Sequence, residues 1–83
     1  MFYVYLIKSV NSDQKYIGCT DNLKERLETH NSGGSIYTKP YRPWIVATYL
    51  AFQEEKIARD FEKHLKIQDL RISNSKVMKN LIQ

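Results

Sequence analysis

The chain has 83 residues, of which 42% are apolar and 27% are charged. Domains usually contain about 100–200 residues, so this length predicts one small domain, residues 1–83, and excludes two separate cores. The composition is close to the globular average, which argues against a disordered chain or a coiled coil. Thirteen Lys and Arg against nine Asp and Glu give a net charge of +4. That charge permits nucleic-acid binding without requiring it.

Cysteine usage and hydropathy point to the compartment. No stretch approaches the about 18 consecutive apolar residues of a membrane span, and no basic segment precedes the N-terminal apolar run. The single Cys19 excludes an internal disulfide, and one cysteine with two histidines is too few for the usual zinc site. These features predict a reduced, cytoplasmic domain with no membrane partner, and they leave its oligomeric state open.

Two strands begin the predicted order of elements. Residues 2–7 are rich in aromatic and β-branched side chains, residues 11–13 supply turn chemistry, and residues 15–19 resume the strand pattern. This arrangement predicts a β-hairpin. Gly18, near the end of the second strand, indicates a bend or a close approach of another group to the backbone.

A helix follows the hairpin. Asn22 and Glu25 form a capping-box pattern at its start, and the helix is expected to run to about His30. It should end within residues 31–34, where a glycine can take the left-handed conformation. Residues 31–43 show no periodic pattern and are predicted to form a long loop, a kind of segment that is often functional.

The last part of the chain predicts a strand and two helices. Residues 44–52 are nearly all apolar, which indicates a strand buried on both faces at the centre of the sheet. Residues 54–68 carry apolar side chains at helical spacing. Ser73 or Ser75 caps a predicted third helix, whose apolar residues fall within 77–82. The resulting order, ββαβαα, favours an α+β fold.

Polar residues lie close to the apolar faces of both main helices. Leu23 and Leu27 define the buried face of the first helix, and Arg26 and His30 lie on or beside that face. A cation there needs a partner or a cleft. The alternative is an Arg26 side chain that lies along the core with its charge in water.

Glu62 lies at the edge of the apolar face of the second helix, because it follows Phe61 and is four residues beyond Ala58. A carboxylate in such a place is either half of a structural ion pair, with Arg26 as the candidate partner, or a metal ligand. The spacing alone does not decide between them.

The hairpin tyrosines have the same ambiguity. Tyr5 and Tyr16 share one face of the sheet if the turn between the strands contains an even number of residues, because a shift by one residue inverts every side chain. They serve either as packing residues with hydrogen-bonded hydroxyls or as chemical groups.

A larger pattern connects these residues. Tyr16-Ile17-Gly18 precedes Arg26 by ten residues, Val4-Tyr5-Leu6 lies in the first strand, and Glu62 belongs to the helical segment 58–66. The combination resembles the GIY-YIG nuclease family, in particular its small stand-alone bacterial members, over residues 2–82. The second tripeptide matches in full, whereas the first keeps only its tyrosine. Further similar segments are Asn22-Leu23, Arg26-Leu27, His30-Asn31, Tyr37-Thr38-Lys39 and Pro43-Trp44.

The resemblance implies a three-stranded antiparallel sheet flanked by helices, and an endonuclease that hydrolyses phosphodiesters with one Mg²⁺ or Mn²⁺ ion. Tyr5 and Tyr16 would be active-site tyrosines, with the choice of general base between them open. Arg26 would bind the phosphate, and Glu62 would hold the metal ion.

Three further positions are less well defined by the resemblance. His30 lies where family members carry His or Tyr, and it would orient groups or relay protons. Asn74 is similar to an active-site asparagine of the excision-repair relatives. Cys19 stands where those relatives place a lysine directly after the second tripeptide, so the chain departs from their pattern at this position.

Nucleic-acid binding is expected to involve the loop after the first helix. Lys39, Tyr41 and Arg42 combine positive charge with an aromatic ring, which suits phosphate contacts and stacking on unpaired bases. Trp44 is better explained as a core residue.

The sequence therefore leaves three function classes. The favoured one is a metal-dependent endonuclease acting on nucleic acid, DNA in preference to RNA, that recognises structure or damage and has a role in DNA repair or recombination. A partner protein that supplies targeting is compatible with so short a chain. The second class is a catalytically weak or inactive nucleic-acid-binding module of the same fold. The third is a structural or protein-interaction domain in which Arg26 and Glu62 merely join two helices.

Overall fold

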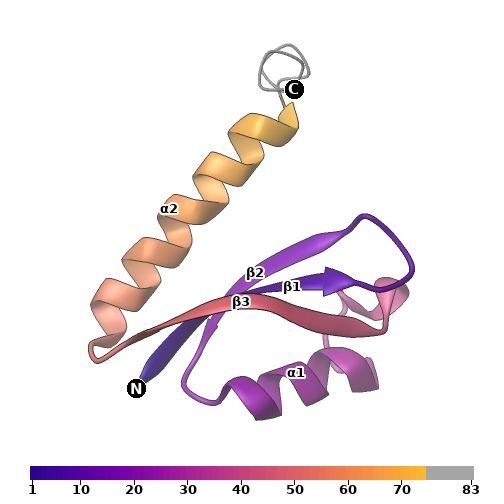
Figure 1. Cartoon of the computed structure of the whole chain (residues 1–83), viewed down its shortest axis with the longest axis horizontal. Helices are drawn as coiled ribbons and strands as arrows, with labels where there is room; N and C mark the ends of the chain where they lie inside the picture. Colours follow the sequence, from indigo (N-terminus) through magenta and orange to yellow (C-terminus); the bar gives the residue numbers. More distant parts are fainter. Residues whose placement is uncertain (75–83) are drawn as a thin grey trace.

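A computed structural model describes the backbone of residues 1–74 and the side chains of residues 1–67 (Figure 1). The third helix predicted within residues 77–82 lies outside this part of the chain. The elements, in chain order, are β1 (Phe2–Ser9), β2 (Lys15–Thr20), α1 (Leu23–Ser32), a short 3-10 helix η1 (Lys39–Tyr41), β3 (Trp44–Phe52) and α2 (Glu55–Asn74).

The three strands form one antiparallel sheet in the order β2-β1-β3. The hairpin and the α+β class are confirmed, but the prediction that residues 44–52 form the central strand is wrong. β1 is central, and β3 is an edge strand with exposed side chains at Ile45, Tyr49 and Leu50. An apolar run indicates a strand, but it does not show how many neighbours that strand has.

The two helices lie on opposite sides of the sheet (Figure 1). On the α1 side, Tyr5, Ile7 and Trp44 form a buried cluster against which Leu23 and Leu27 pack. The predicted core role of Trp44 is confirmed, since only 3% of this residue is exposed. The buried faces of α1 and of the hairpin therefore meet around Tyr5 of β1.

On the other side, α2 contacts all three strands. Ala58 of this helix is fully buried, and the rings of Phe61 in α2 and Phe52 in β3 lie 5.4 Å apart. The helix continues to Asn74, beyond the predicted end at residue 68. None of the described helices is long and apolar enough to cross a membrane.

The ends of α1 follow the predicted chemistry. The side chain of Asn22 accepts a hydrogen bond from the backbone N–H of Glu25 at 3.1 Å, which satisfies one of the free donors of the first turn. Gly33 closes the helix with φ of 87°, a left-handed conformation that favours glycine. The segment predicted as a loop begins two residues later than expected and contains η1.

Asn31 ties the end of α1 to the start of β3. Its Oδ1 accepts a hydrogen bond from the Trp44 backbone N–H at 2.6 Å, and its Nδ2 donates to the Trp44 carbonyl at 3.1 Å. One side chain thus satisfies both backbone groups of the buried tryptophan, and it fixes where α1 lies on the sheet.

Replacing Asn31 by alanine is expected to lower the free energy of unfolding by about 1–3 kcal/mol, because two partly buried backbone groups lose their partner. Urea denaturation followed by circular dichroism measures this change. Asn11→Ala is the matched control, since the Asn11 amide donates one exposed hydrogen bond, to the Arg42 carbonyl. Equal losses in the two variants would contradict the anchoring role of Asn31.

Candidate active site

The candidate site is built around the face of the hairpin that α1 covers. The strand register pairs Tyr5 with Gly18 and Ile7 with Tyr16, so Tyr5 and Tyr16 lie on the same face, as predicted. A Cβ at Gly18 would collide with the hydroxyl and ring of Tyr5. The absence of a side chain at Gly18 therefore lets the Tyr5 ring lie across β2, which confirms the predicted close approach.

A buried hydrogen-bond chain leads from Tyr5 into the protein. The Tyr5 hydroxyl lies 3.0 Å from His30 Nε2, and His30 Nδ1 lies 2.8 Å from Thr38 Oγ1. Thr38 Oγ1 donates to the Ser35 carbonyl at 3.5 Å, so it accepts the proton of His30 Nδ1. This network assigns Nε2 as an acceptor, and Tyr5 as the donor to it.

Three aromatic rings form a cluster around this chain. The centre of the His30 ring lies 5.9 Å from that of Tyr5 and 5.0 Å from that of Tyr16, and the two tyrosine rings are 6.4 Å apart. His30 and Tyr5 are almost fully buried, whereas Tyr16 is half-buried. Tyr16 is therefore the tyrosine of the pair that is open to solvent.

Arg26 lies at the margin of this cluster. The residue is exposed, which agrees with the alternative of an arginine beside the buried face with its charge in water. The guanidinium lies close to the Tyr5 hydroxyl. Burial raises the pKa of Tyr5 to about 12, with the neighbouring charges of Tyr16 and Glu62 adding to the rise and Arg26 opposing it. Tyr5 therefore keeps its proton at neutral pH.

Glu62 approaches the same cluster from α2. Its side chain is only 16% exposed, and its Oε2 lies 3.1 Å from Lys66 Nζ. The predicted Arg26–Glu62 ion pair is absent from the described part of the chain, because the lysine one helical turn beyond Glu62 takes that place. The charge of Glu62 nevertheless acts on the pKa of Tyr5. Tyr5, Tyr16, Arg26, His30 and Glu62 thus converge, and we call this set the β2-edge site.

Cys19 lies beside the carboxylate on the α2 side of β2. Burial raises the pKa of its thiol, and the negative charge of Glu62 adds to the rise. The thiol is therefore neutral at physiological pH and adds no charge to the site.

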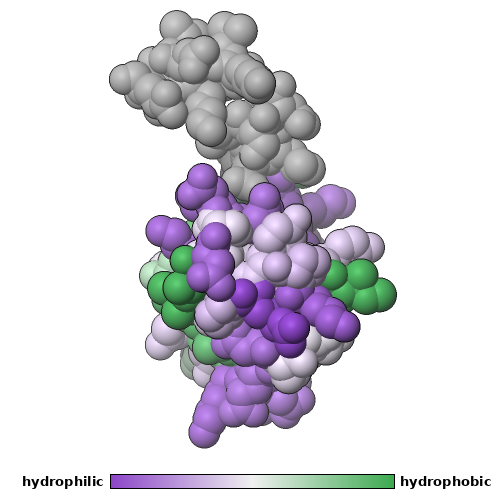
Figure 2. Space-filling model, turned by 90° about the vertical axis from the view of Figure 1, so that its right-hand side faces the viewer, coloured by the Kyte–Doolittle hydropathy of each residue, from purple (hydrophilic) through white to green (hydrophobic). Residues whose placement is uncertain are grey.

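The residues predicted to bind nucleic acid lie in and next to η1. Lys39, Tyr41 and Arg42 are exposed, and the Arg42 Nε donates to the Lys39 carbonyl at 3.1 Å. Figure 2 shows that the end of the molecule with the β1–β2 turn is largely hydrophilic. Asn74 is the last residue of α2, and its side chain lies outside those that the structure describes.

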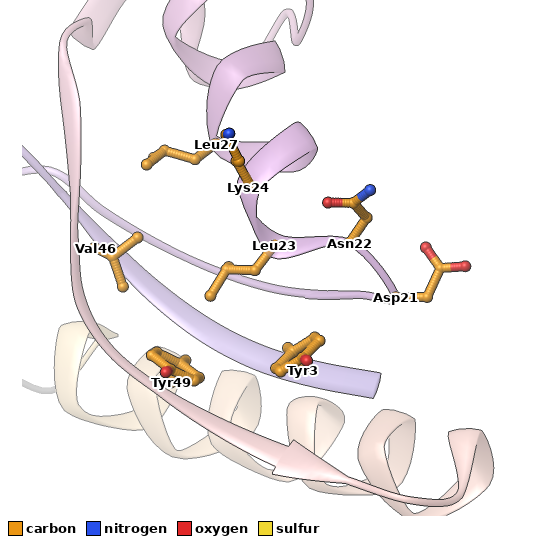
Figure 3. Close-up of a pocket in the computed structure, with 8 residues that line it drawn as sticks. All are labelled: Tyr3, Asp21, Asn22, Leu23, Lys24, Leu27, Val46 and Tyr49. Atoms are coloured by element: carbon orange, nitrogen blue, oxygen red, sulfur yellow. The ribbon is translucent and has the colours of Figure 1, made fainter. Parts of the chain in front are cut away.

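A separate hollow of about 540 Å³ lies between the start of α1 and the sheet (Figure 3). Leu23 and Leu27 of α1 face Val46 and Tyr49 of β3 across it, and Tyr3 lies on its floor. The lining is mainly apolar and contains none of the β2-edge residues. The residues of the β2-edge site therefore lie outside this hollow.

His30 is expected to titrate below its ordinary pKa of about 6.5, because burial disfavours the charged imidazole and the charge of Arg26 acts in the same direction. Stability that depends on neutral His30 is therefore present above about pH 6.5 and is lost as the pH falls below it. Long-range ¹H–¹⁵N NMR spectra that distinguish His30 from His64 measure the midpoint. A midpoint at or above 6.5 for His30 would contradict the buried neutral assignment.

Comparisons with known proteins identify the family. The family model of the GIY-YIG catalytic domain matches residues 1–75, and the chain belongs to this nuclease family. It is 32% identical to the UPF0213 protein CPE1444 of Clostridium perfringens over 95% of this chain and 89% of that protein. It is 36% identical to the UPF0213 protein SH2523 of Staphylococcus haemolyticus, over 72% and 76% of the two chains. No solved structure gives a significant match. Nucleases of the family generally depend on a divalent metal ion.

The sequence interpretation did not identify Thr38 or Lys66 as part of the site. Both residues fall within segments that are similar to the family, Tyr37-Thr38-Lys39 and residues 58–66, but neither segment gives them a role. Lys66 is four residues beyond Glu62, a spacing at which helical side chains meet, so that signal was available. The contact of Thr38 with His30 depends on how the segment after α1 folds back, and no local pattern reveals it.

Proposed function

We propose that this protein is a metal-dependent endonuclease that hydrolyses phosphodiester bonds in nucleic acid, DNA in preference to RNA. The observation that carries the proposal is the convergence of two tyrosines, an arginine, a histidine and a carboxylate at the β2-edge site of a chain from a nuclease family. The proposed substrate is distinguished by structure or damage rather than by sequence. A role in DNA repair or recombination fits such a preference, and a partner protein would supply targeting.

Glu62 is the residue that would hold the metal ion. The described residues contain no group of three or more His, Cys, Asp or Glu side chains that could hold a metal ion. A single, mostly buried carboxylate instead fits one Mg²⁺ or Mn²⁺, which keeps several waters and takes other oxygen ligands from phosphate. Such an ion neutralises charge that develops on the phosphoryl and leaving oxygens.

Arg26 is proposed to bind the scissile phosphate. Its planar guanidinium offers paired donors that match phosphate oxygens, and its exposed position leaves those donors accessible. Tyr5 keeps its proton and directs it to His30 Nε2. The Tyr5 oxygen is then free to accept from Arg26, so Tyr5, His30 and Thr38 together position the arginine.

Tyr16 is proposed as the general base that takes the proton of the attacking water. It is the half-buried tyrosine at the edge of the sheet, and the Lys66 ammonium lies over its ring, 5.7 Å from the ring centre. Tyr5 is poorly suited to this task because burial raises its pKa to about 12.

The proposal is tested with the full chain and a panel of branched, nicked, flapped and single-stranded DNAs and matched RNAs. Cleavage should require Mg²⁺ or Mn²⁺, stop with EDTA and be fastest on one of the interrupted DNAs. The leaving group should be the 3′ oxygen, so products carry a 5′ phosphate and a 3′ hydroxyl. Absence of cleavage of every substrate with either metal would overturn the proposal.

One observation favours the second candidate, a nucleic-acid-binding module that cuts poorly. Cys19 holds a neutral thiol next to Glu62, where the related sequences carry a lysine. In that case DNA affinity survives Glu62→Gln and weakens with Lys39→Ala plus Arg42→Ala, while no variant and no metal ion produces cleavage.

A further inference from the structure

Lys66 is held inside the candidate site by two contacts. Its Nζ lies 3.1 Å from Glu62 Oε2 and 5.7 Å from the centre of the Tyr16 ring. The lysine side chain is 46% exposed. Its ammonium therefore lies between the carboxylate of α2 and the tyrosine of β2, on the side of the site that is open to solvent.

This pair differs from the other two ion pairs of α2 in the described residues. Lys56–Asp60 and Arg59–Glu55 have the same four-residue spacing, but at least half of each side chain is exposed. Exposed pairs of this kind contribute little. The Glu62–Lys66 pair is the one whose carboxylate is largely withdrawn from water, so its geometry is more strongly determined.

The charge of the site makes Lys66 significant. The residues of the site that carry a full charge are Arg26, Lys66 and Glu62. Their sum is one positive charge, which suits the single negative charge of a phosphodiester. Without Lys66 the sum is zero, and the attraction for the phosphate is reduced.

We propose that Lys66, which α2 brings to the site, is a second phosphate-binding cation beside Arg26. This inference rests on the proposed action on nucleic acid. When Glu62 binds the proposed metal ion instead of Lys66, the flexible side chain of Lys66 is free to contact a phosphate oxygen beside Tyr16.

The test compares Glu62→Gln with Glu62→Gln/Lys66→Met. Glu62 is neutral in both variants, so loss of Lys66 does not leave an unpaired carboxylate that would itself repel DNA. Affinity for a short flapped DNA is measured in EDTA between about 50 and 200 mM salt. One phosphate contact contributes about 0.9 to the slope of log affinity against log salt. The slope of the double variant should be smaller by about 0.9 than that of Glu62→Gln. Its gain in DNA affinity between about 200 and 50 mM salt should therefore be about threefold smaller than the gain of Glu62→Gln.

Lys56→Met, added to Glu62→Gln, is the matched control, because Lys56 forms an exposed pair with Asp60 on the same helix. It should change the slope less than Lys66→Met does, and Lys66→Arg should preserve the slope. Circular dichroism verifies that every variant is folded. Equal slopes with and without Lys66 would overturn the inference, as would an equal effect of Lys56→Met.

The outcome is separable from that of the proposed function. A wild-type protein that cleaves DNA while the slope is independent of Lys66 refutes the inference alone. A slope that depends on Lys66, in a protein that never cleaves, refutes the nuclease activity alone and supports a binding module. A wild-type protein that binds no DNA at about 50 mM salt overturns both.

Discussion

Glu62→Gln should lower the single-turnover rate of phosphodiester hydrolysis by about 10²–10³-fold or more. The carboxylate is the proposed ligand for the divalent ion, and the electrostatic stabilisation supplied by such an ion is worth several kcal/mol, with each 1.36 kcal/mol equal to about tenfold in rate. The neutral amide keeps the shape of the side chain but not its charge. The rate is measured with excess protein on the best substrate of the panel, at saturating Mg²⁺.

Asp60→Asn is the control for this experiment. Asp60 pairs with Lys56 at 3.2 Å, four residues away on the same helix, much as Glu62 pairs with Lys66. Its loss removes an equivalent charge on the surface of α2 and should change the rate by less than about threefold, as expected for an exposed ion pair. If the two variants slow cleavage equally, or if Glu62→Gln cleaves as the wild type does, the role of Glu62 as metal ligand is refuted.

Gly18→Ala should both destabilise the protein and disable the site. The added Cβ would collide with the hydroxyl and ring of Tyr5, a buried side chain that has little room to move. Overpacking of this kind costs about 1–3 kcal/mol of unfolding free energy. Moving the ring also breaks its hydrogen bond with His30, and displacement of catalytic groups by about 1 Å can cost about 10²-fold in rate.

A double-mutant cycle with Tyr5→Phe tests whether the collision with the Tyr5 side chain causes the loss of stability. The Tyr5 hydroxyl is the atom that the new methyl group approaches most closely, so Gly18→Ala should cost less stability in the Tyr5→Phe background. Urea denaturation gives the four free energies. An identical cost in both backgrounds would show that the effect arises from the backbone of β2 and not from contact with Tyr5.

The parts of the site that were predictable depend on local spacing or on the resemblance. The common face of Tyr5 and Tyr16 follows from strand alternation and the parity of the turn. The half-buried position of Glu62 follows from its place beside Phe61 on a helix.

The parts that were not predictable depend on contacts between distant segments. The apolar pattern of β3 predicted a central strand, but β3 lies at the edge of the sheet, beside β1. The place of a strand in a sheet depends on how the chain returns to the sheet after α1, and the strand's own residues do not show this. The pairing of Glu62 with Lys66 instead of Arg26 depends on where α2 crosses the sheet. The hydrogen bond between His30 and Thr38 likewise needs the fold of the segment that includes η1.

Binding of Mn²⁺ is the measurement that tests most directly whether the β2-edge site is one chemical unit, because it requires no knowledge of the substrate. Paramagnetic broadening in ¹H–¹⁵N NMR spectra should be strongest for the amides around Gly18 and around Glu62, two segments far apart in the sequence. It should disappear in Glu62→Gln and persist in Asp60→Asn. Broadening that is centred elsewhere, or that is unchanged in Glu62→Gln, would contradict the assignment of this site.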